Sequence, residues 1–436
     1  MVSVDVRRCA YCGSCVSVCP TNALDLRETR LTVAETCIEC NLCLPACPMG
    51  ALIAAGERTR RTPHSRDSYD VVVIGAGPGG SLAAREAAAR GRSVLLLEKR
   101  QEIGSPVRCA EGIAHEALVS FIAPDPLWIS AEIRRVSIAL TEHGREKVWE
   151  SEGPAEQHVG YVLERRVFDR VLAEQAGRAG AHVAVKTAAL GLLRDGNAVS
   201  GVVAEGPWGK REIASRVVIG ADGVESRVGV WAGLDTTLPL QDHMACAQFL
   251  LAGIDIDPQC TYYYLDGELA PGGYAWVFPK GQRRANVGLG VQASLSNRSP
   301  FELLTRFIEK HAWLAQGSPV TLVAGGVPVG LRPARIVTHG CILVGDAARQ
   351  GDPLTGGGIA NAMAAGALAG AVAAEAIAAG DVSQEALLRY EQAWATGSGR
   401  QMARNYRLRQ RLPASERMNE RFVGVFARAI GASKWT

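Results

Sequence analysis

Cysteines are concentrated at the start of this chain. Eight of its twelve cysteines fall within the first 47 of 436 residues. They form two runs with the same Cys-x2-Cys-x2-Cys-x3-Cys-Pro spacing, offset by 28 residues: Cys9, Cys12, Cys15 and Cys19 before Pro20, and Cys37, Cys40, Cys43 and Cys47 before Pro48. The first nine residues include Asp5, Arg7 and Arg8 and no apolar leader, so we expect a cytosolic protein. Cysteines in that compartment are more often metal ligands or catalytic groups than disulfides.

The spacing resembles the ligand run of bacterial two-cluster ferredoxins, in which the fourth cysteine of each run serves the other cluster. The resemblance implies one 4Fe-4S cluster on Cys9, Cys12, Cys15 and Cys47, and a second on Cys37, Cys40, Cys43 and Cys19. Structural zinc is the main alternative, although a third closely spaced cysteine in both runs suits tetrahedral zinc poorly. A disulfide framework is the other alternative. We expect residues 1–56 to form a small α+β ferredoxin domain that its clusters stabilise and that passes single electrons.

A polar and basic linker is expected at residues 57–68. It contains Pro63, His64 and four arginines, which are Arg58, Arg60, Arg61 and Arg66. We interpret the arginines as a solvated charge run, with docking of an acidic carrier protein as the alternative, and we assign His64 no role. The chain overall is 47% hydrophobic and 21% charged, which suits an ordinary globular protein of two or three domains.

A dinucleotide-binding pattern begins at Tyr69. An apolar strand at Val71–Ile74 precedes a glycine loop, an alanine-rich helix to Arg90 and a second strand at Val94–Leu97 that ends in Glu98. The loop glycines are Gly75, Gly77, Gly79 and Gly80. Such a βαβ unit lets the backbone and the helix N-terminus approach a pyrophosphate, while the acid binds a ribose hydroxyl.

Two later motifs indicate which dinucleotide is bound. Asp222 lies at the end of a strand that begins near Val217. Asp346 lies at the end of another strand, which includes Leu343. Glycines then open a helix through Gly357, Gly358 and Ile359. This second device suits the flavin half of FAD, with Asp346 accepting from ribityl hydroxyls and the loop amides facing the flavin pyrimidine edge.

At this point the chain resembles the FAD-dependent group that contains aromatic hydroxylases and geranylgeranyl reductases. Three strings are similar to archaeal digeranylgeranylglycerophospholipid reductases, and the likeness extends over roughly residues 69–411: Pro106–Gly112, Gly160–Arg165 with Asp169 following, and Tyr274–Gly281 with Gly290 following. The resemblance implies FAD contacts at Arg108, Cys109, Ala110, Gly112, Arg165 and Ala189, with Ala110 standing where the family has glycine.

The resemblance also implies the fold. We expect an α/β protein with a Rossmann-like FAD-binding domain at residues 69–396, built from segments near 69–135, 155–235 and 325–380. An antiparallel substrate-binding sheet is expected as an insertion at about 240–320.

Alternating runs support that sheet. They are Met244–Leu251, Cys260–Leu265, Tyr274–Phe278 and Ala285–Val291. Tyr274, Trp276 and Phe278 then point to one face. An ordinary aromatic core is the alternative, but with the resemblance we expect a wall of an apolar channel for an isoprenoid chain.

Cys109 is the cysteine of most interest outside the two runs. It lies between Arg108 and Glu111, in the loop that the family places at the flavin ring. Our hypothesis is that it shapes the site or supplies a proton during reduction. The remaining cysteines, Cys246, Cys260 and Cys341, are interpreted as packing residues.

Residues 397–436 form a basic tail. Nine basic residues stand there against Glu416 and Glu420, a net charge of +7 in a chain of net charge +3, which leaves −4 for the other 396 residues. Arg400, Arg404, Arg407 and Arg411 share one helical face, and Phe422, Val423, Phe426 and Ile430 form an apolar stripe. We expect amphipathic helices that bind anionic lipid or phosphate headgroups, with a helix capping the core as the alternative.

One further segment, Ile359–Ala379, is long and apolar enough to suggest a membrane span. Its alanines and glycines, with Glu375 among them, favour a core helix instead. No motif for nucleic acid binding is recognisable.

Together these features predict a flavoenzyme that reduces carbon–carbon double bonds of geranylgeranyl chains in archaeal membrane lipid precursors, with electrons passing singly through two 4Fe-4S clusters to FAD. Reduced ferredoxin or a similar low-potential donor is expected, because no second nucleotide-binding glycine loop is visible. We expect a cytoplasmic protein that can contact the inner face of the membrane. The alternatives are a quinone-linked oxidoreductase, a polyprenyl-quinone side-chain reductase, and an electron-transfer module without an organic substrate.

Overall fold

The computed structural model describes residues 1–57, 68–152, 158–411 and 419–430. The predicted linker arginines Arg58, Arg60, Arg61 and Arg66, together with Pro63 and His64, lie outside the described residues, and so do Glu416, Arg417 and Lys434.

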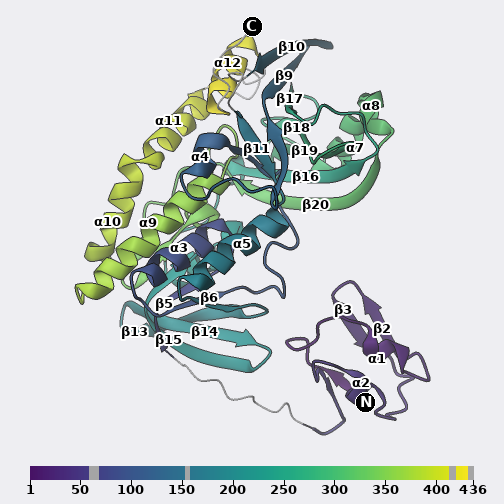
Figure 1. The fold of residues 1–436 in the computed structure, drawn as a ribbon, viewed down its shortest axis with the longest axis vertical. Coiled ribbons are helices and arrows are strands. Elements are labelled where there is room, and N and C mark those ends of the chain that lie inside the picture. The colour runs from purple at the N-terminus through teal and green to yellow at the C-terminus, as the bar shows by residue number, and fades with distance from the viewer. Residues whose placement is uncertain (58–67, 153–157, 412–418, 431–436) are drawn as a thin grey trace.

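The N-terminal domain is a small α+β unit at one end of the molecule (Figure 1). Strand β1 (Ser3–Val4) pairs with β4 (Leu52–Ile53), and β2 (Leu24–Arg27) pairs with β3 (Arg30–Val33). Two single-turn helices, α1 (Ser14–Ser17) and α2 (Cys43–Ala46), begin within the two cysteine runs. The domain's buried hydrophobic residues are few, and three of these eight are predicted cluster ligands: Val2, Cys9, Cys15, Ala23, Leu24, Cys43, Ala51 and Leu52.

The N-terminal domain contacts the rest of the chain through the loop that begins the first cysteine run. Lys186 Nζ donates to the Cys9 carbonyl at 2.8 Å and lies over the Tyr11 ring. Arg7 pairs with Glu205 at 3.3 Å, and Arg8 Nε donates to the Pro207 carbonyl at 3.0 Å. The first run therefore faces the FAD-binding domain.

The FAD-binding sheet has eight strands. Its order is β12-β6-β5-β15-β14-β13, with β22 beside β15 and β21 beside β22. The bounds are β5 Ser68–Ile74, β6 Val94–Leu97, β12 His182–Ala184, β13 Ala188–Asp195, β14 Ala198–Gly206, β15 Gly209–Gly220, β21 Val337–Thr338 and β22 Cys341–Leu343. Strands β12, β6, β5, β15 and β22 pair in parallel, which confirms the predicted βαβ unit and places the carboxyl ends of β5, β15 and β22 at one edge.

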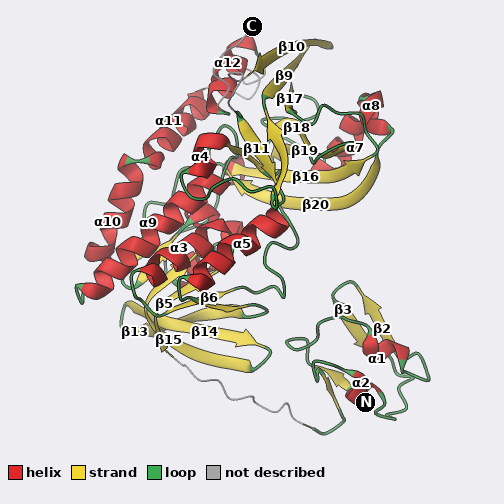
Figure 2. Ribbon diagram, in the orientation of Figure 1, coloured by secondary structure: helices red, strands yellow, loops and turns green. Residues whose placement is uncertain are grey.

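Helices cover this sheet and run on toward the second one (Figure 2). They are α3 Pro78–Ala89, α5 Arg165–Arg178, α9 Ile359–Ala378, α10 Gln384–Thr396 and α11 Ser398–Arg411. By length and composition, α9 could cross a membrane. Here it packs against α3 so closely that a Cβ on Gly366 would come within 2.0 Å of the Gly79 carbonyl oxygen. The contact explains the small residues of α9 and supports the predicted core helix.

The second large sheet has seven strands in the order β10-β9-β17-β18-β19-β16-β20. Their bounds are β9 Arg135–Glu142, β10 Arg145–Glu152, β16 His243–Ala252, β17 Cys260–Asp266, β18 Tyr274–Pro279, β19 Arg284–Gln292 and β20 Ser318–Pro328. The four predicted strands are present, but the expected limits of about 240–320 were too narrow. The hairpin β9–β10 joins the sheet through a parallel pairing of β9 with β17, and β20 extends it beyond residue 320.

Smaller elements complete the body. A three-stranded sheet, β7 Gly112–Ala114, β11 Gly160–Leu163 and β8 Ile129–Ile133, lies between the two large sheets, next to α4 His115–Val119. Helices α7 Pro300–Lys310 and α8 Ala312–Ala315 pack against the seven-stranded sheet, which we call the substrate-side sheet. Helix α6 Arg227–Trp231 follows β15. Short 3-10 turns stand at Gly223–Glu225, Leu240–Asp242 and Gly345–Ala348.

The C-terminal tail is helical, as predicted, but it is docked on the protein. Arg400, Arg404, Arg407 and Arg411 on α11 are exposed, whereas Arg409 is buried and donates to the Val329 and Gln241 carbonyls. On α12 (Glu420–Ala429), Phe422, Val423 and Phe426 are buried in one cluster with residues of β9 and β17, and Ile430 packs against it. The docked α12 fits the alternative that this part of the tail caps the core, because the protein's own sheet covers its apolar stripe.

Candidate active site and cluster sites

The two cysteine sets surround two separate hollows. Cys9, Cys12, Cys15 and Cys47 line one, and Cys19, Cys37, Cys40 and Cys43 line the other, so the fourth cysteine of each run lies with the first three of the other run. The Ala23 amide donates to Cys19 Sγ and the Ala51 amide donates to Cys47 Sγ, each at 3.2 Å. Among the described residues, no three His, Cys, Asp or Glu side chains meet as ligands of one metal ion would. Cysteines set around a hollow, with amide donors to sulfur, suit a 4Fe-4S cube better than mononuclear zinc.

A cavity of about 1010 Å³ connects the dinucleotide motifs to the aromatic strand. Sixteen predicted site residues line it: Gly77, Gly79, Gly80, Glu98, Arg108, Cys109, Ala110, Gly112, Arg165, Tyr274, Trp276, Phe278, Asp346, Gly357, Gly358 and Ile359. The fold therefore brings together segments that are up to 280 residues apart, which places both predicted functions at one site.

Three predicted FAD residues do not line the cavity. Gly75 has φ +102°, and a Cβ there would lie 2.3 Å from the Ala221 carbonyl oxygen, so its role is the tight turn after β5. Ala189 lies half-buried in β13 against the sheet core. Asp222 accepts from the Val228 amide at 3.0 Å, and its Oδ1 is buried without a hydrogen-bond partner among the described residues.

The glycine loop suits a pyrophosphate. A Cβ on Gly80 would lie 1.8 Å from the Gly75 carbonyl oxygen, so Gly80 allows α3 to pack on the loop. A Cβ on Gly77, in contrast, would meet no protein atom within 4 Å. Gly77 thus leaves space at the start of α3, where amide groups favour an anion. Glu98 is held by the Ala76 and Arg100 amides at 3.2 and 2.9 Å and still faces the cavity.

The flavin-side acid is also in place. Asp346 lies on the 3-10 turn after β22 and faces the cavity beside the start of α9. Burial raises the pKa of this carboxyl, and the Arg165 guanidinium opposes the shift. A buried acid that faces a cavity has unused hydrogen-bonding capacity, which ribityl hydroxyls could satisfy. The residues present therefore fit FAD, which would supply hydride transfer and accept electrons one at a time.

The aromatic strand forms one wall of the cavity. The Tyr274 hydroxyl donates to the Thr355 carbonyl at 2.5 Å, and Trp276 Nε1 donates to Gln248 Oε1 at 2.8 Å. Phe426 of α12 packs edge-to-face on Tyr274, with ring centroids 5.1 Å apart, and lines the same cavity. The sequence analysis missed Gln248 and Phe426 as site residues. The helical spacing of Phe422 and Phe426 was visible in the sequence, but the strands against which they pack were not.

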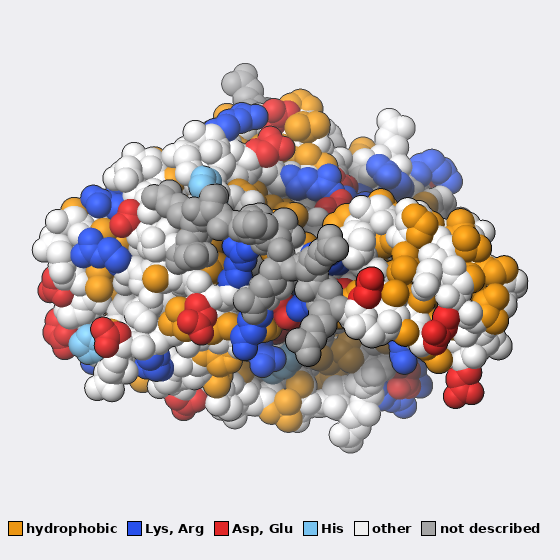
Figure 3. Space-filling model, turned by 90° about the horizontal axis from the view of Figure 1, so that it is seen from below, with side chains coloured by type: hydrophobic (Ala, Val, Ile, Leu, Met, Phe, Trp, Pro, Cys, Tyr) orange, Lys and Arg blue, Asp and Glu red, His pale blue; other side chains and the backbone are white. Residues whose placement is uncertain are grey.

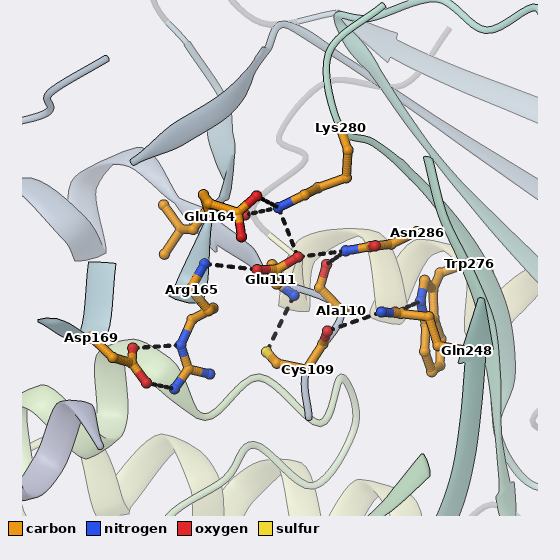
Figure 4. A network of polar contacts seen from close by, with 11 residues as sticks. Cys109, Ala110, Glu111, Glu164, Arg165, Asp169, Gln248, Trp276, Lys280 and Asn286 are labelled. Atoms are coloured by element: carbon orange, nitrogen blue, oxygen red, sulfur yellow. Dashed lines mark hydrogen bonds and ion pairs between the residues drawn. The ribbon is translucent and has the colours of Figure 1, made fainter. Parts of the chain in front are cut away.

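Cys109 lies at the meeting point of the two sheets (Figure 4). Its Sγ accepts from the Glu111 amide at 3.2 Å, and Gln248 Nε2 donates to its carbonyl at 3.1 Å. Burial raises the pKa of the thiol, and the nearby Arg165 guanidinium lowers it in part. Burial thus favours the protonated thiol, and the cation beside it would stabilise the thiolate.

Arg165 is fixed by Asp169 one helical turn along α5. The guanidinium makes two parallel hydrogen bonds to the carboxylate, at 2.8 and 2.7 Å, and both side chains are largely buried. Although burial disfavours the charged guanidinium, Asp169 holds the pKa of Arg165 above its ordinary range. The pair positions a permanent positive charge next to Cys109.

Cys246 packs against the buried cluster that contains Trp276 and Phe278, as predicted, and it also lines the cavity. The nearby Cys109 contributes to a raised pKa of the Cys246 thiol. Burial is the larger cause and raises the Cys246 pKa to about 12. Cys260 and Cys341 are buried away from the cavity, as predicted.

Comparisons with known proteins agree with this geometry. Residues 242–327 match the geranylgeranyl reductase catalytic domain, residues 68–269 match an FAD-binding domain, and residues 2–25 match a 4Fe-4S binding domain. Digeranylgeranylglycerophospholipid reductase from Methanothrix thermoacetophila is 51% identical over 342 residues, which are 78% of this chain and 86% of the relative. The chain belongs to the digeranylgeranylglycerophospholipid reductase family. It therefore joins a reductase of this family to an N-terminal 4Fe-4S domain.

Other members and more distant structures support the assignment. The reductase of the same name from Methanocella arvoryzae is 47% identical over 79% of this chain and 87% of its own length. A geranylgeranyl bacteriochlorophyll reductase-like structure from Thermoplasma acidophilum has a TM-score of 0.76 at 42% identity, covering 79% of this chain and 88% of that one. A flavin-dependent brominase, at 19% identity and a TM-score of 0.61 over 84% of this chain and 94% of its own, shares the fold alone.

Proposed function

We propose that this protein saturates carbon–carbon double bonds in the geranylgeranyl chains of archaeal membrane lipid precursors. One observation carries the proposal: the FAD motifs and the aromatic wall of Tyr274, Trp276 and Phe278 line one continuous cavity. An apolar chain bound along that wall would lie against the place where the flavin motifs converge. Its double bonds would then be within reach of a hydride donor.

We also propose that the N-terminal domain holds two 4Fe-4S clusters and feeds electrons singly to the reductase body. Support comes from the two cysteine-lined hollows and from the contacts of the Cys9 loop with Lys186 and Pro207. The other hollow, which Cys40 helps to line, has exposed apolar neighbours, since Ile38 and Leu42 flank the exposed Cys40. Hydrophobic side chains gather on this end of the molecule in Figure 3. A small reduced carrier such as ferredoxin could dock there.

Cys109 supplies the proton in this proposal. Reduction of a double bond needs a hydride on one carbon and a proton on its neighbour. Cys109 is protonated, lines the cavity and has Arg165 beside it to stabilise the thiolate that remains. Its position is set by Gln248 and by the Glu111 amide.

The surface of α11 supports a contact with membranes. Arg400, Arg404, Arg407 and Arg411 are all exposed on this helix, next to a cavity edge that includes Ser398, Gln401 and Met402. Anionic headgroups would attract these arginines. We propose that the protein works in the cytoplasm at the inner membrane face, where its lipid substrate would be available.

The test is anaerobic incubation of dithionite-reduced protein with geranylgeranylated glycerophospholipid, followed by mass spectrometry of the lipid. Mass gains in steps of two hydrogens are expected. Unchanged lipid together with rapid reduction of a soluble quinone would contradict the proposal and favour a quinone-linked oxidoreductase. The chelated protein, which lacks its clusters, should reduce the lipid when dithionite reduces the flavin directly but not when reduced ferredoxin is the only donor.

A further inference from the structure

Behind Cys109 lies a buried charged network that the proposed function leaves unused (Figure 4). Lys280, the residue after β18, places its Nζ 2.8 Å from Glu111 Oε2 and 3.2 Å from Glu164 Oε2. The same ammonium donates to the Leu163 carbonyl at 2.5 Å. One lysine therefore bridges the loop that carries Cys109 and the start of α5.

The burial of the three side chains is unequal. The side chains of Lys280 and Glu111 are each 5% exposed, whereas that of Glu164 is 42% exposed. Solvent thus reaches the network at its Glu164 end, and Glu111 faces the cavity at the other end. Two carboxylates thus share one ammonium, so a proton that leaves Lys280 has a carboxylate acceptor on either side.

Glu111 is held in place next to Cys109. Its carboxylate accepts from Asn286 Nδ2 at 2.8 Å and from the Arg165 amide at 2.7 Å, while its own amide donates to Cys109 Sγ. Its φ is +75°, a conformation that a residue other than glycine adopts only when its surroundings impose it. Asn286 also donates to the Ala110 carbonyl at 3.2 Å. The substrate-side sheet therefore fixes both the acid and the thiol.

We propose that Glu164, Lys280 and Glu111 form a proton route from solvent that restores the Cys109 thiol between successive reductions. The inference rests on the proposed function, in which Cys109 gives up its proton. It adds the residues that resupply that proton, and it explains why a lysine and two glutamates are kept together behind the cavity.

The steps balance as follows in atoms and charge. In each saturation the Cys109 S–H bond breaks and a C–H bond forms on the substrate, with the electron pair of the reduction supplied by the reduced cofactor. The Lys280 ammonium then passes a proton to the Glu111 carboxylate, and Glu111 passes it on to the thiolate. The Glu164 carboxylate takes a proton from solvent and returns it to the neutral lysine. One solvent proton is consumed for each double bond.

A dedicated route is needed because the substrate is apolar. A lipid chain that fills the cavity displaces water from the side of Cys109 that faces the aromatic wall. If one bound chain is reduced at more than one double bond, the thiol must be protonated again while the lipid is still bound. A path through the protein on the opposite side meets that need.

The experiment follows the successive saturations of bound lipid under excess dithionite, with samples quenched over time for mass spectrometry. In Lys280→Met and Glu164→Gln we expect the first gain of two hydrogens to keep close to its wild-type rate, since Cys109 starts protonated. Later gains should slow by about 10- to 100-fold in Lys280→Met and less in Glu164→Gln, which water can partly replace. A matched control is Lys310→Met, which removes a 2.8 Å ion pair to Asp266 away from the cavity.

Two further measurements separate proton transfer from a structural role. Formate, a small diffusible acid, should restore the later saturations in Glu164→Gln, and it would not repair a misplaced loop. Lys280→Arg keeps the positive charge but does not release its proton, so it should behave like Lys280→Met if its bound FAD remains normal. If the first and later saturations slow equally, or formate has no effect, the route is overturned. A wild-type protein that saturates no bond would overturn the proposed function itself, whereas an active wild type with unaffected variants overturns the route alone.

Discussion

The N-terminal domain and the reductase body hold their sites in different ways. In the N-terminal domain the ligands are part of the core, because Cys9, Cys15 and Cys43 are three of its eight buried hydrophobic residues. In the body, the glycine loop, Asp346 and the aromatic strand stand at the edges of large apolar cores that include Val72, Leu96 and Ile342. The comparison indicates that the first region depends on its cofactor in order to fold, and that the second folds first and then binds its cofactor.

The largest expected effect comes from removing the clusters. We expect Cys15→Ser combined with Cys43→Ser to unfold residues 1–57, since so few buried hydrophobic residues cannot offset the chain entropy. The body should keep its FAD and its melting temperature. Hydrogen exchange followed by mass spectrometry checks both regions in one sample. Protected amides in residues 1–57 of this variant would break the comparison.

A pair of glycine variants tests whether the body folds independently of FAD. Gly80→Ala should destabilise the apoprotein by about 4 kcal/mol or more, because its Cβ would lie 1.8 Å from a carbonyl oxygen. Gly77→Ala meets no protein atom, so the apoprotein should keep its stability while its dissociation constant for FAD rises at least about tenfold. Urea unfolding and flavin fluorescence titration measure the two effects. Equal losses of stability would contradict this division.

Breaking the buried ion pair on α5 should lower the free energy of unfolding more than breaking the exposed pair on the same helix. Asp169→Ala leaves Arg165 buried without its partner, and we expect a loss of about 3–5 kcal/mol in the free energy of unfolding. Glu174→Ala removes the exposed pair with Arg178 on the same helix, where we expect about 0.5 kcal/mol or less. Thermal unfolding of both variants provides the measurement. Similar losses of unfolding free energy in the two variants would contradict the burial of the Arg165–Asp169 pair.

Cys109→Ala tests the chemistry of the body with little change in folding. We expect normal FAD content and a 10- to 100-fold lower turnover, because a proton donor is lost. Cys260→Ala serves as the control, since Cys260 is buried outside the cavity and its loss should leave turnover unchanged. Turnover of Cys109→Ala equal to that of the wild type would exclude the thiol as the donor.

The smallest expected effect is a pH dependence of stability at Asp266. Although burial disfavours its charge, Lys310 and the backbone amides of Leu269 and Glu268 lower the pKa of this carboxyl. The unfolded chain therefore binds the proton more tightly, so this stabilisation is complete above about pH 4 and decreases as the pH falls further. We expect about 1 kcal/mol or less. Asp266→Asn should flatten the acid limb of a plot of melting temperature against pH, and an unchanged slope would contradict the assignment.

Local patterns predicted much of the molecule. The alternation of Tyr274, Trp276 and Phe278 placed three side chains on one face, and the structure shows all three in the cavity. The strand, glycine loop and helix after Tyr69 were predicted because each signal lies within a few residues. The β9–β10 hairpin was not assigned to the substrate-side sheet, because its parallel pairing joins strands about 125 residues apart and has no local signal.

Packing partners were the part that the sequence could not supply. Cys246 looked like any buried cysteine, and only the sheet register brings it into the cavity that Cys109 lines. Arg409 lies between Arg407 and Arg411 in the sequence, yet it is buried near Asp242, while those two arginines are exposed.

By itself, the sequence determined the cysteine runs, the dinucleotide loops and the positions of the four alternating strands along the chain, because each depends on residues that are close along the chain. Only the tertiary structure decided that α12 lines the cavity and that Lys280 joins Glu111 to Glu164. Those contacts depend on which faces remain uncovered once both sheets have formed. A charge or an apolar stripe has the same pattern in the sequence whether solvent, a membrane or another part of the protein lies against it.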